Sequence, residues 1–203
     1  MVSEGDWAAA SAADSAVVVA VAGSEAAAVA LAAAARREVG KVRVLSHLLL
    51  PRSALHRRFP SRALTAIEEA IQESERKHRA EVRVAIEVAL DLEELWRVRT
   101  ARARALEVFA ELGVWDTHER NGMLLYVLLA ERDVEIVADS GFDGHVADGE
   151  WQRVCTLVER ELGAGRWRDG VLVGIEAATA LLEREFPRSG ADRNEQENRP
   201  AVL

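Results

Sequence analysis

The sequence predicts an α/β fold, a small three-layer α/β/α sandwich with the element order α-β-α-β-β-α-α. Segments in which apolar residues alternate are interspersed with segments in which they recur every three to four positions. Two apolar segments, 123–130 and 134–138, are separated by only three polar residues, which indicates a β-hairpin. The 203 residues, 49% of them hydrophobic, are enough for one such domain with flexible N- and C-terminal extensions.

The first half of the domain is predicted to contain a helix, a strand and a second helix. Ser61 is a suitable N-cap, and apolar residues at helical spacing continue to about His78. Apolar residues then occupy every second position over 82–90, which predicts a half-buried strand. Asp91 caps the next helix, which is expected to continue to Gly113.

The second half contains the hairpin and two further helices. Apolar residues at helical spacing predict one helix over 148–163 and another over 169–186, and Pro187 ends the second. A helix joins the strand over 82–90 to the strand over 123–130, so we expect a right-handed parallel crossover. The hairpin then places the third strand beside the second.

The composition divides the chain into four segments. Residues 1–40 are an Ala-rich extension, and we expect it to be disordered or loosely helical. Its acidic start and interrupted apolar run do not suit a signal peptide. Residues 41–58 form a basic amphipathic segment, and residues 59–187 form the domain. Residues 188–203 are polar and rich in charge, which predicts a disordered tail.

The distribution of charge restricts the choice of partner. The formal net charge of −8 argues against a general nucleic-acid-binding protein. Residues 36–62, by contrast, hold eight Lys and Arg residues against one acid, with leucines between them. Such a segment suits either peripheral contact with an anionic membrane or packing against the protein's own acidic body. We expect a cytoplasmic protein, peripheral at the inner membrane surface in the first case, with an unknown protein partner.

Few motifs for known chemistry occur in the chain. The single cysteine, Cys155, excludes an intramolecular disulfide and lies on the apolar stripe of a predicted helix, so we expect an inert core thiol. The sequence has no Ser-His-Asp pattern, P-loop, dinucleotide-binding fingerprint or paired CxxC motif. No organic cofactor is therefore expected.

The predicted hairpin brings a set of side-chain oxygens to one edge of the sheet. Residues that enter its first strand and residues that leave its second strand lie at the same end. Carboxylate and amide oxygens are ligands for Ca²⁺ or Mg²⁺. The candidate metal ligands are Asp116, Glu119, Asn121, Asp139 and Asp143. If the strand over 82–90 joins this sheet, its start adds His78 and Glu81 to the same edge.

Several local motifs follow the order of a known family. They lie at the end of the first helix, at the start of the second strand, in the hairpin turn and after the third strand. These positions are Glu75, His78, Glu81, Gly122, Arg132 and Gly141. In this order of motifs, residues 60–187 resemble the TPM domain family, known from bacterial envelope proteins and a thylakoid lumen protein. The resemblance implies a small α/β/α sandwich, and family members have been described as calcium-binding or phosphatase-like.

Each candidate also has a simpler interpretation. The acidic residues can form a set of solvated loops, and the positive charge of Arg120 among them opposes a cation. Asn121 and Gly122 tolerate positive φ and can serve turn geometry alone. His78, at a helix end, and Arg132, in the hairpin turn, are then surface residues.

Two functions agree with these observations. The first is a non-catalytic accessory or interaction module that binds a divalent cation at the sheet edge. It is favoured because the sequence has no recognisable pair of nucleophile and base. The alternative is a metal-assisted phosphatase that uses the same edge, where the cation polarises a phosphoryl oxygen and activates water.

Overall fold

The computed structural model describes residues 43–51, 53–97, 100–188 and 194–203. Arg43 to Leu203 form one compact unit, which extends beyond the predicted limits 59–187 at both ends. The expectations for residues 1–40 and for the start of the basic segment lie outside the described residues.

The order of elements agrees with the predicted order. After a helical stretch at 43–49, the elements are α3 (Ala54–Arg58), α4 (Ser61–Glu75), β1 (Glu81–Glu87), α5 (Leu92–Arg97), α6 (Ala101–Glu111), β2 (Gly122–Leu128), β3 (Asp133–Ala138), the 3₁₀-helix η2 (Ser140–Phe142), α7 (Asp148–Gly163), α8 (Trp167–Glu185) and β4 (Ala201–Val202). The single helix expected over 91–113 is instead two helices. Asp91 and Glu94 form the predicted capping box of α5, but Thr100 caps α6 separately by accepting the N–H of Ala103 at 3.1 Å.

The four strands form one sheet in the order β3-β2-β1-β4. β1 pairs with β2 in parallel, with Glu81 opposite Gly122, and β2 pairs with β3 antiparallel. The predicted parallel crossover and the predicted hairpin are therefore both confirmed. β4 lies on the free edge of β1 and runs parallel to it, opposite Ala85 and Ile86.

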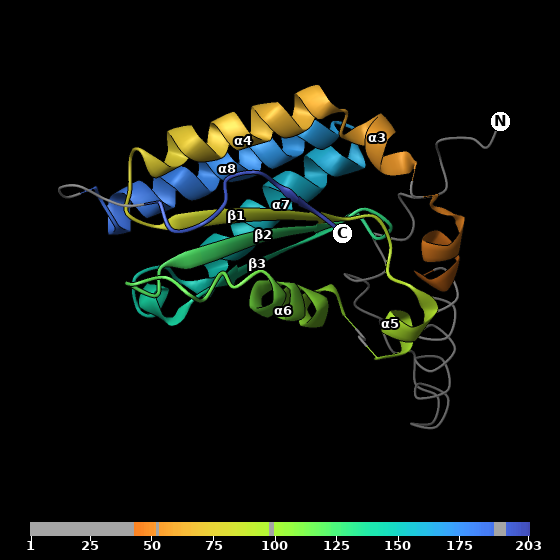
Figure 1. Cartoon of the computed structure of the whole chain (residues 1–203), viewed down its shortest axis with the longest axis horizontal. Coiled ribbons are helices and arrows are strands. Elements are labelled where there is room, and N and C mark those ends of the chain that lie inside the picture. The colour runs from red at the N-terminus through yellow and green to blue at the C-terminus, as the bar shows by residue number, and fades with distance from the viewer. Residues whose placement is uncertain (1–42, 52, 98–99, 189–193) are drawn as a thin grey trace, which may run out of the picture. The chain divides into compact units, whose positions relative to one another are not determined.

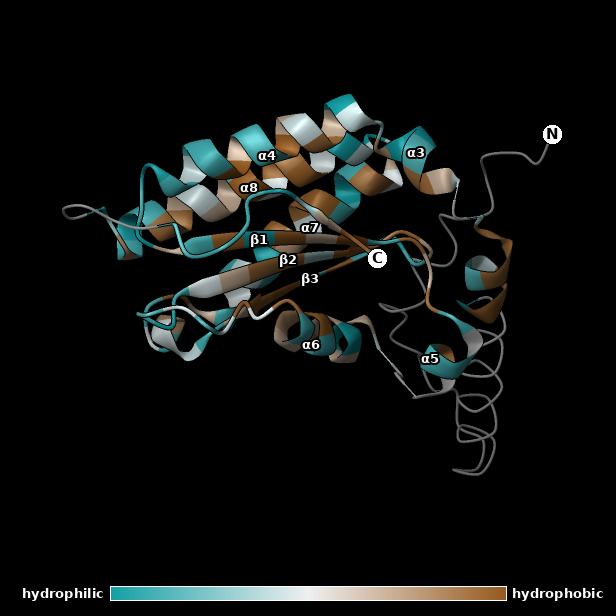
Figure 2. Cartoon of the chain, viewed as in Figure 1, coloured by the Kyte–Doolittle hydropathy of each residue, from teal (hydrophilic) through white to brown (hydrophobic). Residues whose placement is uncertain are grey.

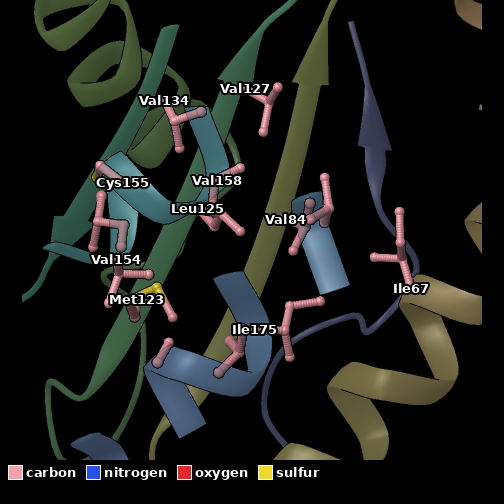
Figure 3. Close-up of a cluster of buried hydrophobic side chains, with 14 of the residues drawn as sticks. Ile67, Val84, Met123, Leu125, Val127, Val134, Val154, Cys155, Val158 and Ile175 are labelled. Atoms are coloured by element: carbon pink, nitrogen blue, oxygen red, sulfur yellow. The ribbon is translucent and has the colours of Figure 1, made fainter. Parts of the chain in front are cut away.

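Helices cover both faces of this sheet, which confirms the α/β/α sandwich (Figure 1). α4, α7 and α8 lie on one face, and α6 lies on the other. Figure 2 shows that the strands are mostly hydrophobic, whereas α4 and α6 carry both hydrophobic and hydrophilic residues. Figure 3 shows part of the main core, where Ile67 of α4, Val158 of α7 and Ile175 of α8 pack near Val84 and Leu125 of the sheet.

β1 differs from the half-buried strand that the alternation predicts, because all seven of its residues are buried. Arg83 is 6% exposed and Glu87 is 5% exposed, although they lie on the polar face of the strand. α6 packs on β2 and β3 on this side of the sheet, and residues 194–203 bind along β1. Charged residues at alternate positions here therefore face protein groups instead of water.

The tail is the second difference from the sequence-based expectations. Its polar composition predicts disorder over 188–203, but residues 201–202 form β4, and Leu203 donates its N–H to the carbonyl of Ile86 at 3.0 Å. Asn198 is only 8% exposed. Hydrogen bonds to the free edge of a strand and to its buried charges hold this part of the tail, and composition does not report such long-range partners.

The described part of the basic segment is bound to the body of the protein. Arg43 forms an ion pair with Glu131 at 2.7 Å. His47 is buried, with Nε2 2.7 Å from the same carboxylate and Nδ1 accepting the N–H of Leu90 at 2.9 Å. These contacts favour packing against the protein's own acidic groups, the second interpretation of this segment. No helix within the described ranges is both long and apolar enough to span a membrane.

The contacts of Glu131 predict a dependence of stability on pH. Burial alone would raise the pKa of Glu131, but hydrogen bonds from His47 and Arg43 lower it below its ordinary value. The ionised form therefore stabilises the fold above the unfolded pKa of about 4.3, and this contribution is lost as the pH falls through the folded pKa. We expect Glu131→Gln to lower the free energy of unfolding at neutral pH by about 1.5–3 kcal/mol, as measured by urea denaturation.

The same variant is expected to show a weaker loss of stability between about pH 6 and pH 3 than the wild type. Glu135 on β3 provides a matched control, because burial and the charge of Asp133 raise its pKa. Its ionised form costs stability, so Glu135→Gln is expected to be equally or more stable at neutral pH. Identical pH profiles for the wild type and Glu131→Gln would contradict the prediction.

Candidate functional site

The ends of three strands meet at one edge of the sheet, as the hairpin and crossover predict. The N–H of Gly141, after β3, donates to the carbonyl of Arg120, before β2, at 2.9 Å. The N–H of Asp139 donates to the carbonyl of Gly122 at 3.0 Å. β1 starts at the same edge because Glu81 lies opposite Gly122. The predicted location is therefore formed by main-chain contacts between the loops.

The side chains that precede β2 are occupied locally. Glu119 forms an ion pair with Arg79 at 2.5 Å. Asn121 is buried, its side-chain amide donates to the carbonyl of Arg79, and its own N–H donates to the hydroxyl of Thr117 at 3.0 Å. These bonds join the start of β1 to the start of β2, so Asn121 has a structural role at this edge.

The remaining candidate ligands are also separate from one another. The carboxylate of Asp139 caps the 3₁₀-helix by accepting the N–H of Ser140 at 2.6 Å. Asp116 and Asp143 are exposed. In the part of the chain that the structure describes, no three His, Cys, Asp or Glu side chains are grouped so that they can hold a metal ion. Metal binding by the five predicted residues stays a prediction that this arrangement does not favour.

The two glycines of this edge are required by close main-chain contacts. A Cβ atom on Gly122 would lie 1.9 Å from the carbonyl oxygen of Val114, and one on Gly141 would lie 2.4 Å from that of Arg120. The expectation that Asn121 and Gly122 serve a positive φ is wrong, because the residue with positive φ here is Arg120, at 53°. The glycine at 122 instead lets the loop after α6 lie against β2.

His78 is not the surface residue that its position at a helix end suggests. It is fully buried, with Nε2 2.8 Å from the hydroxyl of Ser74. That hydroxyl is 2.6 Å from the hydroxyl of Thr179 on α8, which donates to the carbonyl of Ile175. The chain of hydrogen bonds joins α4 to α8 inside the core, so His78 contributes to the fold.

Glu75 and Glu81, the two acids of the same motif, bind the tail. The two carboxylate oxygens of Glu81 accept the N–H groups of Glu195 and Gln196, each at 3.2 Å. Glu75 accepts the N–H of Val82 at 3.0 Å and a hydrogen bond from the side-chain amide of Asn198. They border a pocket of about 290 Å³, which is lined by Gln72, Glu75, Arg76, Ala80, Glu81, Arg188, Asn194 and Asn198.

Arg83 completes this set of contacts. Its Nη1 donates to the carbonyl of Glu197 and, at 3.1 Å, to the carbonyl of Arg199. Its Nη2 donates to the carboxylate of Glu197 at 3.1 Å. We call Glu75, Glu81, Arg83 and the free edge of β1 the β1 groove, and residues 194–203 the tail segment. The β1 groove recognises main-chain N–H and C=O groups, which is the chemistry of peptide binding.

Comparison with known proteins identifies the family. A family model described as the TPM domain matches residues 59–181, which is more than half of the chain. The chain belongs to the TPM domain family. The resemblance inferred from the motifs over 60–187 is thereby confirmed. The tail segment lies outside the matched residues of the TPM domain.

Solved structures agree with this assignment. The BA42 protein from the psychrophilic bacterium Bizionia argentinensis has a TM-score of 0.62 and 26% identity, over 71% of this chain and 95% of that protein. The N-terminal domain of a protein from P. gingivalis has a TM-score of 0.52 and 20% identity, over 66% of this chain and 83% of that domain, and supports the fold alone. Comparison with curated proteins gives no match.

Arg132, the motif residue of the TPM hairpin turn, makes a surface contact, as predicted. Its φ is 54°, and its guanidinium carbon lies 5.8 Å from the ring centre of Trp167. Arg58 lies over the same ring at 4.3 Å. Burial lowers the pKa of Arg58, and the positive charges of Arg132 and Arg57 lower it further. This arrangement holds α3, the turn and the start of α8 together.

A buried ionic network on the other face of the TPM sheet was missed by the sequence analysis. Arg104 of α6 donates to Glu87 of β1 at 3.0 Å, and the hydroxyl of Tyr126 on β2 donates to the same carboxylate oxygen at 2.5 Å. Burial and the charge of Glu87 raise the pKa of Tyr126. Burial alone would lower the pKa of Arg104, but bonds to Glu87 and Glu111 raise it. Charges at alternate positions of an apolar strand were the available signal.

Cys155 is an inert core thiol, as expected. The residue is 4% exposed and packs in the main core of the TPM domain. Burial raises the pKa of its thiol to about 12, with a smaller contribution from the charge of Glu159. At neutral pH the thiolate is therefore almost unpopulated, and a nucleophilic role is not supported.

Proposed function

We propose that this TPM domain is a non-catalytic accessory module that acts by binding another polypeptide. The observation that carries the proposal is the use of Glu81 and Arg83, which are 5% and 6% exposed. Both side chains bind main-chain groups of a segment that is distant in sequence. A catalytic acid or base has to reach its substrate, whereas these charges are covered by peptide.

The loops at the sheet edge give further support to a non-catalytic role. Asp139 caps a 3₁₀-helix, and Glu119 is paired with Arg79. The alternative, a metal-assisted phosphatase, requires several oxygens around one ion. Within the described ranges, no group of three His, Cys, Asp or Glu side chains suits such an ion. No observation of the site favours this alternative over the binding module.

A phosphatase assay with the full chain tests the proposal. We expect no hydrolysis of p-nitrophenyl phosphate above the buffer rate, with or without millimolar Ca²⁺ or Mg²⁺, and no increase in melting temperature on adding either ion. Asp139→Ala is expected to behave like the exposed control Asp148→Ala. Cation-dependent turnover that Asp139→Ala removes and Asp148→Ala retains would overturn the non-catalytic assignment and support the phosphatase.

A further inference from the structure

We infer that the β1 groove is the binding site for an extended acidic peptide of a partner protein, and that the tail segment is its tethered competitor. The inference rests on the proposed interaction function and specifies its partner and its regulation. It is drawn from how the tail segment is held, in which main-chain contacts, side-chain contacts and remaining space each contribute.

Main-chain contacts make up the first part of the inference. Glu81 accepts two successive N–H groups, and Arg83 donates to two carbonyls of the tail segment. β4 then pairs in parallel with Ala85 and Ile86. These contacts use groups that every polypeptide has, so an extended segment from another protein can form the same bonds by strand addition at the edge of β1.

Side-chain contacts define the chemistry of the partner. The amide of Asn198 donates to Glu75, and the carboxylate of Glu197 accepts from Arg83 at 3.1 Å. One position earlier, the amide of Gln196 donates to the carbonyl of Gly113 at 3.1 Å. Asn198 is the most buried of these side chains, whereas the side chain of Glu197 is 68% exposed. The β1 groove therefore selects an amide as its anchor and an acid beside it.

The tail segment is held in a way that permits exchange. β4 has only two residues, and the segment lies outside the family match, so the conserved domain is not defined by it. The pocket of about 290 Å³ beside Asn198 is bordered by Arg76 and Arg188. A partner with a longer amide or acidic side chain at this position gains contacts that the tail segment does not make. Such a partner displaces the tail segment when its own contacts exceed the advantage of the tether.

The tether sets the size of that advantage. A segment of the same chain competes at an effective concentration of about millimolar order. A free peptide of equal intrinsic affinity therefore binds only to the fraction of molecules in which the groove is open. Weakening the tail segment without changing the groove raises that fraction and the apparent affinity together.

Fluorescence anisotropy with a labelled peptide of sequence NEQENRPAVL, which copies the tail segment, tests the inference. The full chain with Glu197→Ala and Asn198→Ala is expected to bind the peptide about tenfold or more tightly than the wild type. Adding Glu75→Gln is expected to remove most of that gain, whereas Glu73→Gln, on the exposed face of α4, is expected to retain it. Melting curves of every variant establish that it is folded.

Three results would overturn the inference. Equal binding by the wild type and the tail variant, absence of binding in a folded tail variant, or equal binding of a scrambled peptide each excludes a tethered competitor. A concentration-dependent dimer of the wild type that Glu75→Gln removes would assign the groove to a second copy and overturn the partner assignment. Phosphatase turnover with the expected peptide binding would instead reject only the non-catalytic proposal, so the two failures are distinguishable.

Discussion

Arg104→Met is expected to lower the free energy of unfolding by about 3–5 kcal/mol, which is a large part of the stability of a domain of this size. The side chains of Arg104 and Glu87 are each 6% exposed, and the hydroxyl of Tyr126 donates to Glu87 as well. Removal of the guanidinium leaves the carboxylate buried without its main counter-charge. Urea denaturation monitored by circular dichroism measures the loss.

A second substitution separates the lost ion pair from lost packing. Adding Glu87→Leu to Arg104→Met removes the uncompensated charge, and we expect at least half of the lost stability to return. Part of the loss is expected to remain, because the hydroxyl of Tyr126 has then lost this acceptor. Arg160→Met is the matched control, since this side chain is 68% exposed, and its effect is expected to be below about 1 kcal/mol. A loss of similar size in both single variants would contradict a special role for the network.

Gly122→Ala is expected to destabilise the domain by about 3 kcal/mol or more. The added Cβ atom would lie 1.9 Å from the carbonyl oxygen of Val114, a main-chain atom that cannot rotate away as a side chain does. Relief of this overlap requires movement of β2 or of the loop after α6. Thermal and urea unfolding of the variant, compared with the wild type, measure the effect.

Gly149→Ala in α7 is the matched control for this change. Its added Cβ atom would have Arg153 Nη1, at 3.8 Å, as its nearest neighbour, so no overlap arises. Alanine is also favoured over glycine within a helix by about 1 kcal/mol or less, and we expect this variant to be as stable as the wild type or slightly more stable. A Gly122→Ala protein with wild-type stability would show that the close contact is readily relieved.

The sequence was informative where local periodicity decides the structure. The apolar segments at 123–130 and 134–138 did form a hairpin, and the helix between β1 and β2 did produce a parallel crossover. The capping pair of Asp91 and Glu94 also formed as predicted. Periodicity did not reveal that the polar face of β1 is buried, because the groups that cover it come from α6 and from the tail segment, which are distant in sequence.

The candidate site was harder to predict than the fold. Proximity of the loops followed from the hairpin, but the partners of each side chain depended on details that no local pattern contains. Glu119 meets Arg79, and Asp139 meets the main chain of its own turn. The motif positions Glu75 and Glu81 were recognised in the sequence, yet their partners lie in a segment that its composition suggested was disordered.

The pairing of the tail segment with β1 also affects the order in which the molecule assembles and opens. Arg83 and Arg199 are 116 positions apart, so this contact closes a long loop and gains little until the rest of the sheet exists. We therefore expect amide hydrogens of 194–203 to exchange with solvent deuterium faster than those of β2. Each such opening bares the edge of β1 while the remaining sheet is intact, and at high concentration that edge becomes a point from which aggregates can grow.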